Sequence, residues 1–326
     1  MKDRAINNLI ELYGQLYKEH VEPFIHENFP QDVSTEPVYY YLDRETIKFR
    51  SGLPILINQM FAGELKNVLP ISASSEIIYA ITLLQDDIID NDEVRWGLPS
   101  GWKKYGIGSI IVSADLSYYY VIDILRKIPK SLTNRGKIIE SFLDSHKKLY
   151  SSVILENNNK KNFNFGIQDV LRVYEFKTMT GINATYCGAL SVDSLPRELY
   201  ENVKEYATYL AYAAQIRDDI KDLELYKKEA SDIRNGYMTY PIVKLGTVIN
   251  NADKEIFKSN FGVDSEDSVN KILFLLEKYD IKSKCIDDVN HFVNYALSKI
   301  ETIKNYDKDK ILETWAEFYR IFDKNK

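Results

Sequence analysis

Two short aspartate-rich stretches have residue types and spacing that could bind a metal ion. Both read Asp-Asp-x-x-Asp, and their aspartates are Asp86, Asp87, Asp90, Asp218, Asp219 and Asp222. On a helix, residues three or four apart lie on one face, so each stretch would hold its carboxylates side by side. Clustered carboxylates repel one another unless a cation neutralises them. The spacing therefore predicts a cation site at each stretch.

Oxygen ligands without a neighbouring His or Cys favour Mg²⁺, which binds one or two protein carboxylates, water and substrate phosphate oxygens. A single Asp cluster is more often a solvated acidic face of a helix. Here the same spacing recurs after two separate apolar segments, which argues against that simpler interpretation. We expect Mg²⁺ and an anionic ligand.

Composition narrows the class of protein. The net charge of the 326 residues is −6, and no basic run dominates, so nucleic acid is not an expected partner. The two cysteines have no paired spacing, which fits a reducing compartment without a zinc site. The N-terminal residues have mixed charge, and no eighteen consecutive apolar residues occur. We therefore expect a cytoplasmic protein without a transmembrane segment.

The apolar periodicity is helical along the whole chain, and no segment alternates as a strand would. Predicted helices cover 6–17, 42–69, 77–90, 109–128, 131–155, 170–190 and 198–224, with further helical runs over 242–326. Pro70 is expected to end the second helix, and Ser72, Ser74 and Ser75 to cap the third. The segments 91–108, 156–166 and 226–239 are predicted loops. The fold prediction is all-α: one domain over 1–326, a large helical bundle in which the two aspartate helices meet across a central cavity.

In their order and spacing, these motifs resemble those of the trans-isoprenyl diphosphate synthases, or polyprenyl synthetases. The resemblance extends from about residue 42 to 240. The family's first aspartate motif is followed by Arg-Arg-Gly-x-Pro-Thr, and here Arg95-Trp96-Gly97-Leu98-Pro99-Ser100 follows. Further similar stretches are Lys104-Tyr105-Gly106, Ala114-Asp115, Lys177-Thr178, Gln215 to Asp222, and Ser231 to Gly236.

The resemblance implies an isoprenoid-synthase bundle that binds several Mg²⁺ ions and an allylic prenyl diphosphate. In such enzymes pyrophosphate leaves, and the double bond of isopentenyl diphosphate attacks the allylic cation. Carried over, the catalytic residues would be Asp86, Asp87, Asp90, Lys177, Asp218 and Asp219, and all six motif aspartates, Asp222 included, would be metal ligands. Arg95, Lys177, Thr178 and Gln215 would contact the diphosphate or steady the cation. A homodimer is also implied.

Several positions depart from the family pattern at its isopentenyl diphosphate pocket. The Gly-Lys-x-x-Arg motif has its nearest match at 46–50, which offers Lys48 and Arg50; alignment on Pro54 instead puts Arg50 at the Lys and Leu53 at the Arg. Tyr79 stands where the family has His. Trp96 replaces the second Arg and so removes charge-assisted phosphate contacts. We expect Lys48, Arg50, Tyr79 and Trp96 to line an altered acceptor site.

Two departures lie on the donor side. The family's Gly-Gln-x-x-Asp aligns with 151–155 and ends here in Leu155, and its Gly-Lys-x-Thr aligns with Gly236-Tyr237-Met238-Thr239. One metal-assisting Asp and one diphosphate-binding Lys are thereby lost. Metal binding is expected to be weaker than is usual in the family, but retained.

Three functions fit these residues. The first is a polyprenyl diphosphate synthase with an unusual acceptor site. The second is a family-derived class I terpene cyclase or a prenyltransferase to a different acceptor, because the aromatic faces of Tyr79 and Trp96 could stabilise a carbocation. The third is a regulatory subunit of a heteromeric prenyl diphosphate synthase, which the altered motifs suggest and the two retained aspartate motifs oppose.

Overall fold

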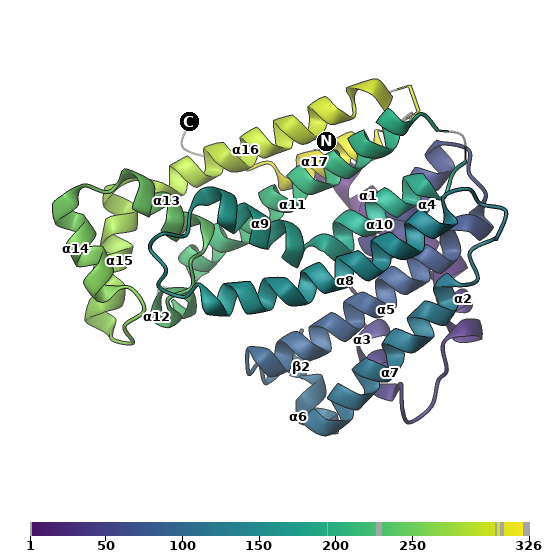
Figure 1. The fold of residues 1–326 in the computed structure, drawn as a ribbon, viewed down its shortest axis with the longest axis horizontal. Coiled ribbons are helices and arrows are strands. Elements are labelled where there is room, and N and C mark those ends of the chain that lie inside the picture. The colour runs from purple at the N-terminus through teal and green to yellow at the C-terminus, as the bar shows by residue number, and fades with distance from the viewer. Residues whose placement is uncertain (1, 194, 226–229, 304, 307–309, 322–326) are drawn as a thin grey trace. The chain divides into compact units, whose positions relative to one another are not determined.

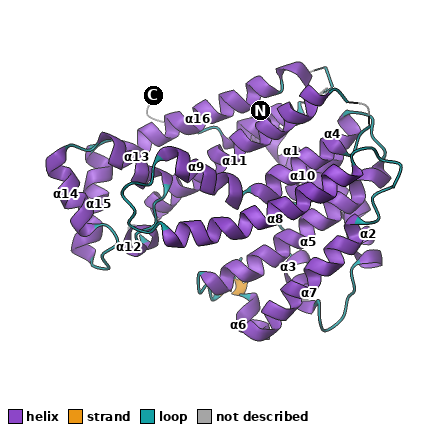
Figure 2. Cartoon of the chain, viewed as in Figure 1, coloured by secondary structure: helices purple, strands orange, loops and turns teal. Residues whose placement is uncertain are grey.

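The chain is all-α, as predicted. The computed structural model describes residues 2–193, 195–225, 230–303, 305–306 and 310–321, and nearly all of its regular structure is helix (Figures 1 and 2). The only strands in these ranges are β1 (Val94–Arg95) and β2 (Leu98–Pro99), which pair as an antiparallel hairpin. Contacts group the chain into two compact units. The single domain with a central cavity stays a prediction.

The first unit comprises Met1–Leu143, Thr180–Lys204 and Ile303–Thr314. Its helices are α1 (Lys2–Leu16), the π-helical turn η1 (Tyr17–Val21), α2 (Glu22–Asn28), α3 (Glu36–Leu42), α4 (Phe49–Met60), α5 (Leu65–Ile89), α6 (Gly101–Tyr105), α7 (Ile107–Leu125) and α10 (Met179–Leu190). The helices α8 (Arg135–Asn158), α11 (Arg197–Leu225) and α17 (Ile311–Tyr319) run from one unit into the other.

The second unit comprises Asp144–Met179, Glu205–Thr302 and Trp315–Lys326. Besides its share of α8, α11 and α17, it contains α9 (Ile167–Lys177), α12 (Ser231–Asn235), α13 (Tyr240–Val248), α14 (Asn251–Asn260), α15 (Glu266–Lys278), α16 (Ile281–Lys299) and most of the short turn η2 (Glu301–Ile303).

Helix α5 is the core of the first unit and ends at the first aspartate motif. It packs against α3, α4 and α7. Its start differs from the prediction: the helix begins at Leu65, Pro70 lies inside it, and Ser72, Ser74 and Ser75 are buried within it rather than capping it. Pro70 is the sixth residue of the helix and cannot donate to the carbonyl of Lys66, but burial of Val68 and Ile71 holds the turn in place.

Several further boundaries differ from the sequence prediction. The predicted helix 42–69 is divided between α4 and the start of α5, and the predicted loops 91–108 and 226–239 contain α6 and α12. Helix α8 continues to Asn158, so Glu156 belongs to a helix and not to the predicted loop. The predicted helix 170–190 is two helices, α9 and α10, with a break at Thr178. The predicted cap Asp169 lies in the first turn of α9, where its carboxylate accepts from Gly166 N at 2.9 Å.

Two helices, α5 and α7, are long and apolar enough to cross a membrane by length and composition. For α5, 78% of its most apolar window is buried within the protein, as expected for a core helix. For α7 the share is 33%, and several of its apolar side chains are exposed.

Candidate functional site: two aspartate motifs and their tyrosines

The first motif lies at the C-terminal end of α5, as predicted. Asp86 and Asp87 occupy the last turn and Asp90 is the C-cap residue. Carboxylates at this end oppose the helix dipole, so a positive group nearby is favourable. The structure supplies one from the following hairpin: Arg95 Nε donates to Oδ1 of Asp87.

Asp87 is fully buried, and both of its oxygens accept hydrogen bonds. Besides Arg95, the hydroxyl of Tyr41 from α3 donates to Oδ2, and the same hydroxyl accepts from Gly101 N at 2.9 Å. Burial, together with the bond to Asp87, raises the pKa of Tyr41 above its usual range, so the hydroxyl keeps its proton. Asp86 is half-buried and Asp90 is exposed. The three aspartates are therefore not equivalent: Asp87 faces the protein interior.

Trp96 forms the tip of the hairpin. Trp96 and Gly97 have φ of 52° and 77°, the positive values that a two-residue type I′ turn requires. The indole is exposed and lies against the Tyr41 ring, with centroids 5.8 Å apart. The predicted acceptor residue Trp96 is thus brought close to the first aspartate motif.

Lys48 and Arg50, the two candidate cations for the acceptor, have different surroundings. Lys48 is buried, and its Nζ lies 3.0 Å from Glu76 Oε1 and donates to Leu42 O at 2.9 Å. The Arg50 guanidinium instead lies 3.8 Å from the centroid of the Tyr79 ring and 4.4 Å from that of Phe49. Its Nε is buried without a hydrogen bond, and no carboxylate of the described residues pairs with it. Lys48 is therefore bound to Glu76 and Leu42 O inside the first unit, whereas Arg50 makes cation–π contacts with Tyr79 and Phe49.

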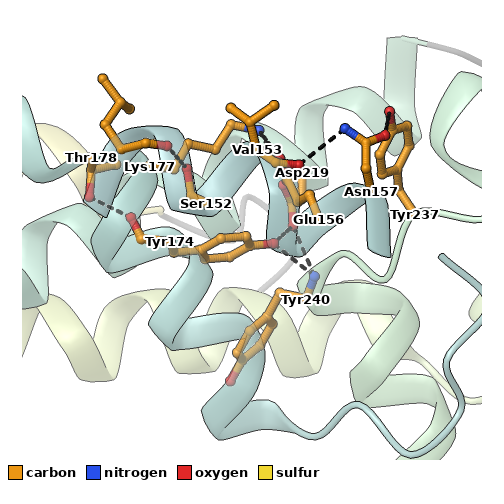
Figure 3. A network of polar contacts seen from close by, with 11 residues as sticks. Ser152, Val153, Glu156, Asn157, Tyr174, Lys177, Thr178, Asp219, Tyr237 and Tyr240 are labelled. Carbon is orange, nitrogen blue, oxygen red and sulfur yellow. Dashed lines mark hydrogen bonds and ion pairs between the residues drawn. The ribbon is translucent and has the colours of Figure 1, made fainter. Parts of the chain in front are cut away.

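The second motif lies near the C-terminal end of α11. Figure 3 shows Asp219 of this motif together with Tyr174 and Tyr240. Oδ2 of Asp219 accepts from the hydroxyl of Tyr174 on α9 and from Tyr240 N at 3.1 Å. Burial raises the pKa of Asp219 to about 8, against the effect of these two donors. Asp218 is exposed and pairs with Lys221 at 3.0 Å. The side chain of Asp222 lies outside the described residues.

Lys177 and Thr178, predicted to bind the diphosphate, follow Tyr174 at the end of α9. Lys177 Nζ lies 3.1 Å from Oε1 of Glu156 on α8, as Figure 3 shows. Thr178 Oγ1 donates to Tyr174 O at 2.6 Å, so this hydroxyl bonds the end of its own helix. Gln215 is half-buried, one turn before Asp219 on α11. The structure thus places Lys177 and Thr178 within the Asp219 network of the second unit.

Four residues of the site were not anticipated from the sequence. Tyr41 and Tyr174 were not distinguishable from core tyrosines. Glu156 directly follows Leu155, where the family's Asp is missing, and brings a carboxylate to Lys177. Lys160 Nζ lies 4.2 Å from the centroid of Tyr237, which stands where the family has Lys. Only Glu156 had a usable sequence signal, an acidic residue one place from the expected one.

A small cavity of about 10 Å³, room for one water, adjoins this network. It is lined by Glu156, Asn159, Phe165, Val170, Val173, Tyr174, Tyr237, Met238 and Thr239. Tyr237, Met238 and Thr239, which align with part of the family's Gly-Lys-x-Thr, therefore lie beside Tyr174, whose hydroxyl donates to Asp219.

A hard cation such as Mg²⁺ requires oxygen ligands. Within the described ranges, no three Asp, Glu, His or Cys side chains come together as a metal site by themselves. Exposed or half-buried carboxylates are present in each motif, namely Asp86, Asp90 and Asp218. Mg²⁺ characteristically takes only one or two protein carboxylates and completes its shell with water and phosphate oxygens. These residues fit Mg²⁺ that is bound together with a diphosphate.

Proteins of known structure share this fold. Geranylgeranyl pyrophosphate synthetase from Pyrococcus horikoshii superposes with a TM-score of 0.82 at 20% identity, covering 98% of this chain and 99% of that one. A polyprenyl synthase from Caulobacter crescentus, complexed with calcium and isoprenyl diphosphate, gives 0.82 at 18% identity over 96% and 97% of the two chains. The helices and the two aspartate motifs define the isoprenyl diphosphate synthase class.

Sequence comparison makes the assignment specific. The short chain isoprenyl diphosphate synthase of Methanothermobacter thermautotrophicus is 22% identical over 320 residues, which cover 96% of this chain and 97% of that protein. The model of the polyprenyl synthetase family matches residues 31–278. The chain belongs to the polyprenyl synthetase family, and it is a prenyltransferase of the polyprenyl diphosphate synthase type.

Proposed function

We propose that the protein is a Mg²⁺-dependent trans-prenyltransferase that ionises an allylic prenyl diphosphate and condenses it with isopentenyl diphosphate to give a longer polyprenyl diphosphate. One observation carries the proposal: in each unit a cationic side chain binds a carboxylate at or beside an aspartate motif. Arg95 bonds Asp87, and Lys177 bonds Glu156 next to Asp219. Such clusters offer oxygens to Mg²⁺ and N–H donors to a diphosphate.

The residues have distinct roles in this reaction. Mg²⁺, when bound, neutralises the charge that develops as pyrophosphate leaves. Asp86, Asp90 and Asp218 would hold the ions, with Asp222 as a further ligand. Arg95 and Lys177 would turn from their carboxylate partners to the phosphate oxygens and stabilise the same charge. Glu156 would act as the carboxylate missing at Leu155.

For the acceptor, we propose that Arg50 binds isopentenyl diphosphate and that Lys48 does not. Lys48 is buried in an ion pair with Glu76, and breaking it would leave an unpaired carboxylate inside the unit. Arg50 has no carboxylate partner among the described residues, and its guanidinium lies against the rings of Tyr79 and Phe49. Gln215 and Thr178 remain proposed contacts of the allylic donor.

A second candidate is supported by the same cluster. Tyr79 and Phe49 of this cluster supply aromatic rings, as does the exposed Trp96 beside Tyr41, and aromatic faces stabilise carbocations. An enzyme with these groups could cyclise the allylic cation or pass it to an acceptor other than isopentenyl diphosphate.

The two candidates are separated by product analysis. Geranyl, farnesyl and geranylgeranyl diphosphates are each incubated with Mg²⁺, with and without isopentenyl diphosphate, and matched reactions contain EDTA. Elongated diphosphates that require both isopentenyl diphosphate and Mg²⁺ would support the first proposal. Hydrocarbons or alcohols formed from the donor alone would support the second. Absence of every product with all donors would contradict both.

We further propose a cytoplasmic homodimer. Both cysteines, Cys187 and Cys285, are buried free thiols, which suits a reducing compartment. Exposed apolar side chains on α7, among them Val112 and Tyr119, suit contact with a second copy of the chain.

A further inference from the structure

In each unit a tyrosine hydroxyl binds both the second aspartate of the motif and a backbone amide, although Asp87 is buried and Asp219 is half-buried. In the first, the Tyr41 hydroxyl donates to Asp87 and accepts from Gly101 N at 2.9 Å. In the second, the Tyr174 hydroxyl donates to Asp219 and accepts from Tyr240 N at 2.8 Å (Figure 3). Each tyrosine comes from a helix distant in sequence from its motif.

The two backbone donors also correspond. Gly101 is the first residue of α6, and Tyr240 is the first residue of α13. Amides in the first turn of a helix have no partner within that helix. In both units the tyrosine hydroxyl accepts a hydrogen bond from such an amide and donates one to the aspartate. A single hydroxyl therefore connects three separate elements.

The joined elements enclose the residues that the reaction uses. The chain from Asp87 to Gly101 contains Arg95 and Trp96, and the chain that returns to Tyr240 contains Tyr237 and Thr239. If the hydroxyl were removed, the aspartate would lose a donor in either unit; Gly101 N would lose its acceptor, whereas Tyr240 N would keep its bond to Asp219. The returning segment would then be less firmly held to its motif.

We propose that Tyr41 and Tyr174 are positioning residues of the prenyl-transfer site. Each keeps the second aspartate of its motif turned into the protein and ties the segment that follows to that aspartate. The other motif carboxylates and Arg95 thereby keep a fixed relation to the metal ions and the diphosphate. Neither tyrosine touches substrate in this proposal, which rests on the proposed function.

The test uses Tyr41→Phe and Tyr174→Phe in the full chain. Matched controls are Tyr39→Phe, whose buried hydroxyl donates to Phe29 O at 3.0 Å from the same helix α3, and Tyr212→Phe, whose hydroxyl donates to Glu175 Oε2 at 3.4 Å in the second unit. All four substitutions remove one hydroxyl, and only the first pair removes one from an aspartate motif.

The first measurement is hydrogen exchange of metal-free protein. Exchange at Gly101 should rise on the order of tenfold in Tyr41→Phe, the equivalent of one lost hydrogen bond, and stay unchanged in Tyr39→Phe. Exchange at Tyr240 should rise less in Tyr174→Phe than at Gly101 in Tyr41→Phe, because Tyr240 N also donates to Asp219 directly. Equal increases in the controls would overturn the proposal.

The second measurement is Mn²⁺ binding in the presence of inorganic pyrophosphate, followed by electron paramagnetic resonance. Half-saturation should shift to a higher Mn²⁺ concentration by roughly tenfold in the two test variants and not in the controls. A purely structural role would lower thermal stability without this shift. Should Tyr41→Phe fail to fold, Tyr174→Phe tests the same claim in the other unit.

These measurements distinguish failure of the positioning role from failure of the proposed function. If wild-type protein converts no allylic diphosphate, the proposed function fails, while exchange and Mn²⁺ binding still report on the tyrosines. If the wild type is active and the test variants match their controls, only the positioning role is wrong. Wild-type protein that binds no Mn²⁺ with pyrophosphate would contradict the inference.

Discussion

Asp86 and Asp87 are adjacent in the chain but differ in what surrounds them. Asp87 is buried and its oxygens accept from Tyr41 and Arg95, whereas Asp86 keeps partial exposure. Asp87→Asn would turn an amide NH₂ toward one of these donors, so we expect a loss of about 2 kcal/mol in the free energy of unfolding. Asp86→Asn should change stability by less than about 0.5 kcal/mol. Urea unfolding of metal-free protein measures both.

Activity should respond differently from stability. Asp86→Asn removes a proposed Mg²⁺ ligand, and Asp87→Asn removes the charged partner of Arg95 beside that site, so we expect kcat/KM to fall at least about 100-fold in both. Equal destabilisation by the two substitutions would show that the surroundings of Asp87 are not what distinguishes it.

Trp96 occupies a turn position that favours Asn or Gly, because φ is positive there. Trp96→Arg would place a guanidinium beside the first motif, and we expect KM for isopentenyl diphosphate to fall by roughly tenfold through charge-assisted phosphate contacts. Trp96→Asn is the control, since it removes the indole and suits the turn without adding charge. Steady-state kinetics with a fixed allylic donor measures the change. A similar KM in both variants would contradict a phosphate contact at this position.

At the scale of elements, Asp219 lies where α9, α11 and α13 meet, and its protonation makes the stability of this junction depend on pH. Its pKa is 3.8 in an unfolded chain and about 8 in the folded protein. Between these values the folded state retains a proton that the unfolded state has released, so the free energy of unfolding falls as pH rises. We expect the melting temperature of metal-free wild type to fall relative to that of Asp219→Asn from about pH 5 to about pH 8. A constant difference would mean that Asp219 is ionised throughout.

The segment between α12 and α13 is held by a close contact of two glycines with Lys161. Gly236 has φ of 73°, and a Cβ there would lie 2.8 Å from Lys161 Cγ and 3.3 Å from Gly262 Cα. Gly236→Ala should therefore lower the free energy of unfolding by about 1–3 kcal/mol and displace Tyr237 to Thr239 from the site. Gly246→Ala, in α13 with no atom near the added Cβ, should be neutral or stabilising. Denaturant unfolding compares the two.

Helices that show a regular apolar period and end at polar turns could be predicted from the sequence. The helical period and the polar turns gave the all-α class, the long helix α11, and the position of the first motif at the end of α5. The start of α5 could not be predicted, because Pro70 and the serines favour a boundary locally and burial of Val68 and Ile71 overrides them. The Asn-rich neighbours of Glu156 predict a loop there, although α8 continues through it.

The positions of the motif aspartates could be predicted, but their partners could not. Asp-Asp-x-x-Asp is a local pattern, whereas Tyr41 lies 46 residues before Asp87, and Tyr174 lies 45 before Asp219. The chain contains 24 tyrosines, so residue type alone does not distinguish these two. The different contacts of Lys48 and Arg50 could not be predicted either. Lys48 pairs with Glu76 and Arg50 contacts Tyr79 because α4 packs against α5.

For the whole molecule, α7 carries the exposed apolar surface through which we expect a proposed dimer to form. One face of α7 buries Ile110, Ala114 and Val121 within the first unit. Among its other apolar side chains, Val112 and Tyr119 are 66% and 68% exposed. In a two-fold dimer the same patch meets itself, so one apolar helix face supplies both sides of the contact.

A charge on this face should separate the copies. We expect wild-type protein to sediment as a dimer at micromolar concentration and Val112→Glu to raise the dissociation constant at least about tenfold, because paired copies would bury two like charges together. Phe274→Glu is the control: Phe274 is 62% exposed, on α15 of the second unit, and its replacement should leave the dimer intact. Sedimentation equilibrium measures both. A monomeric wild type, or equal dissociation of the two variants, would show that α7 does not mediate self-association.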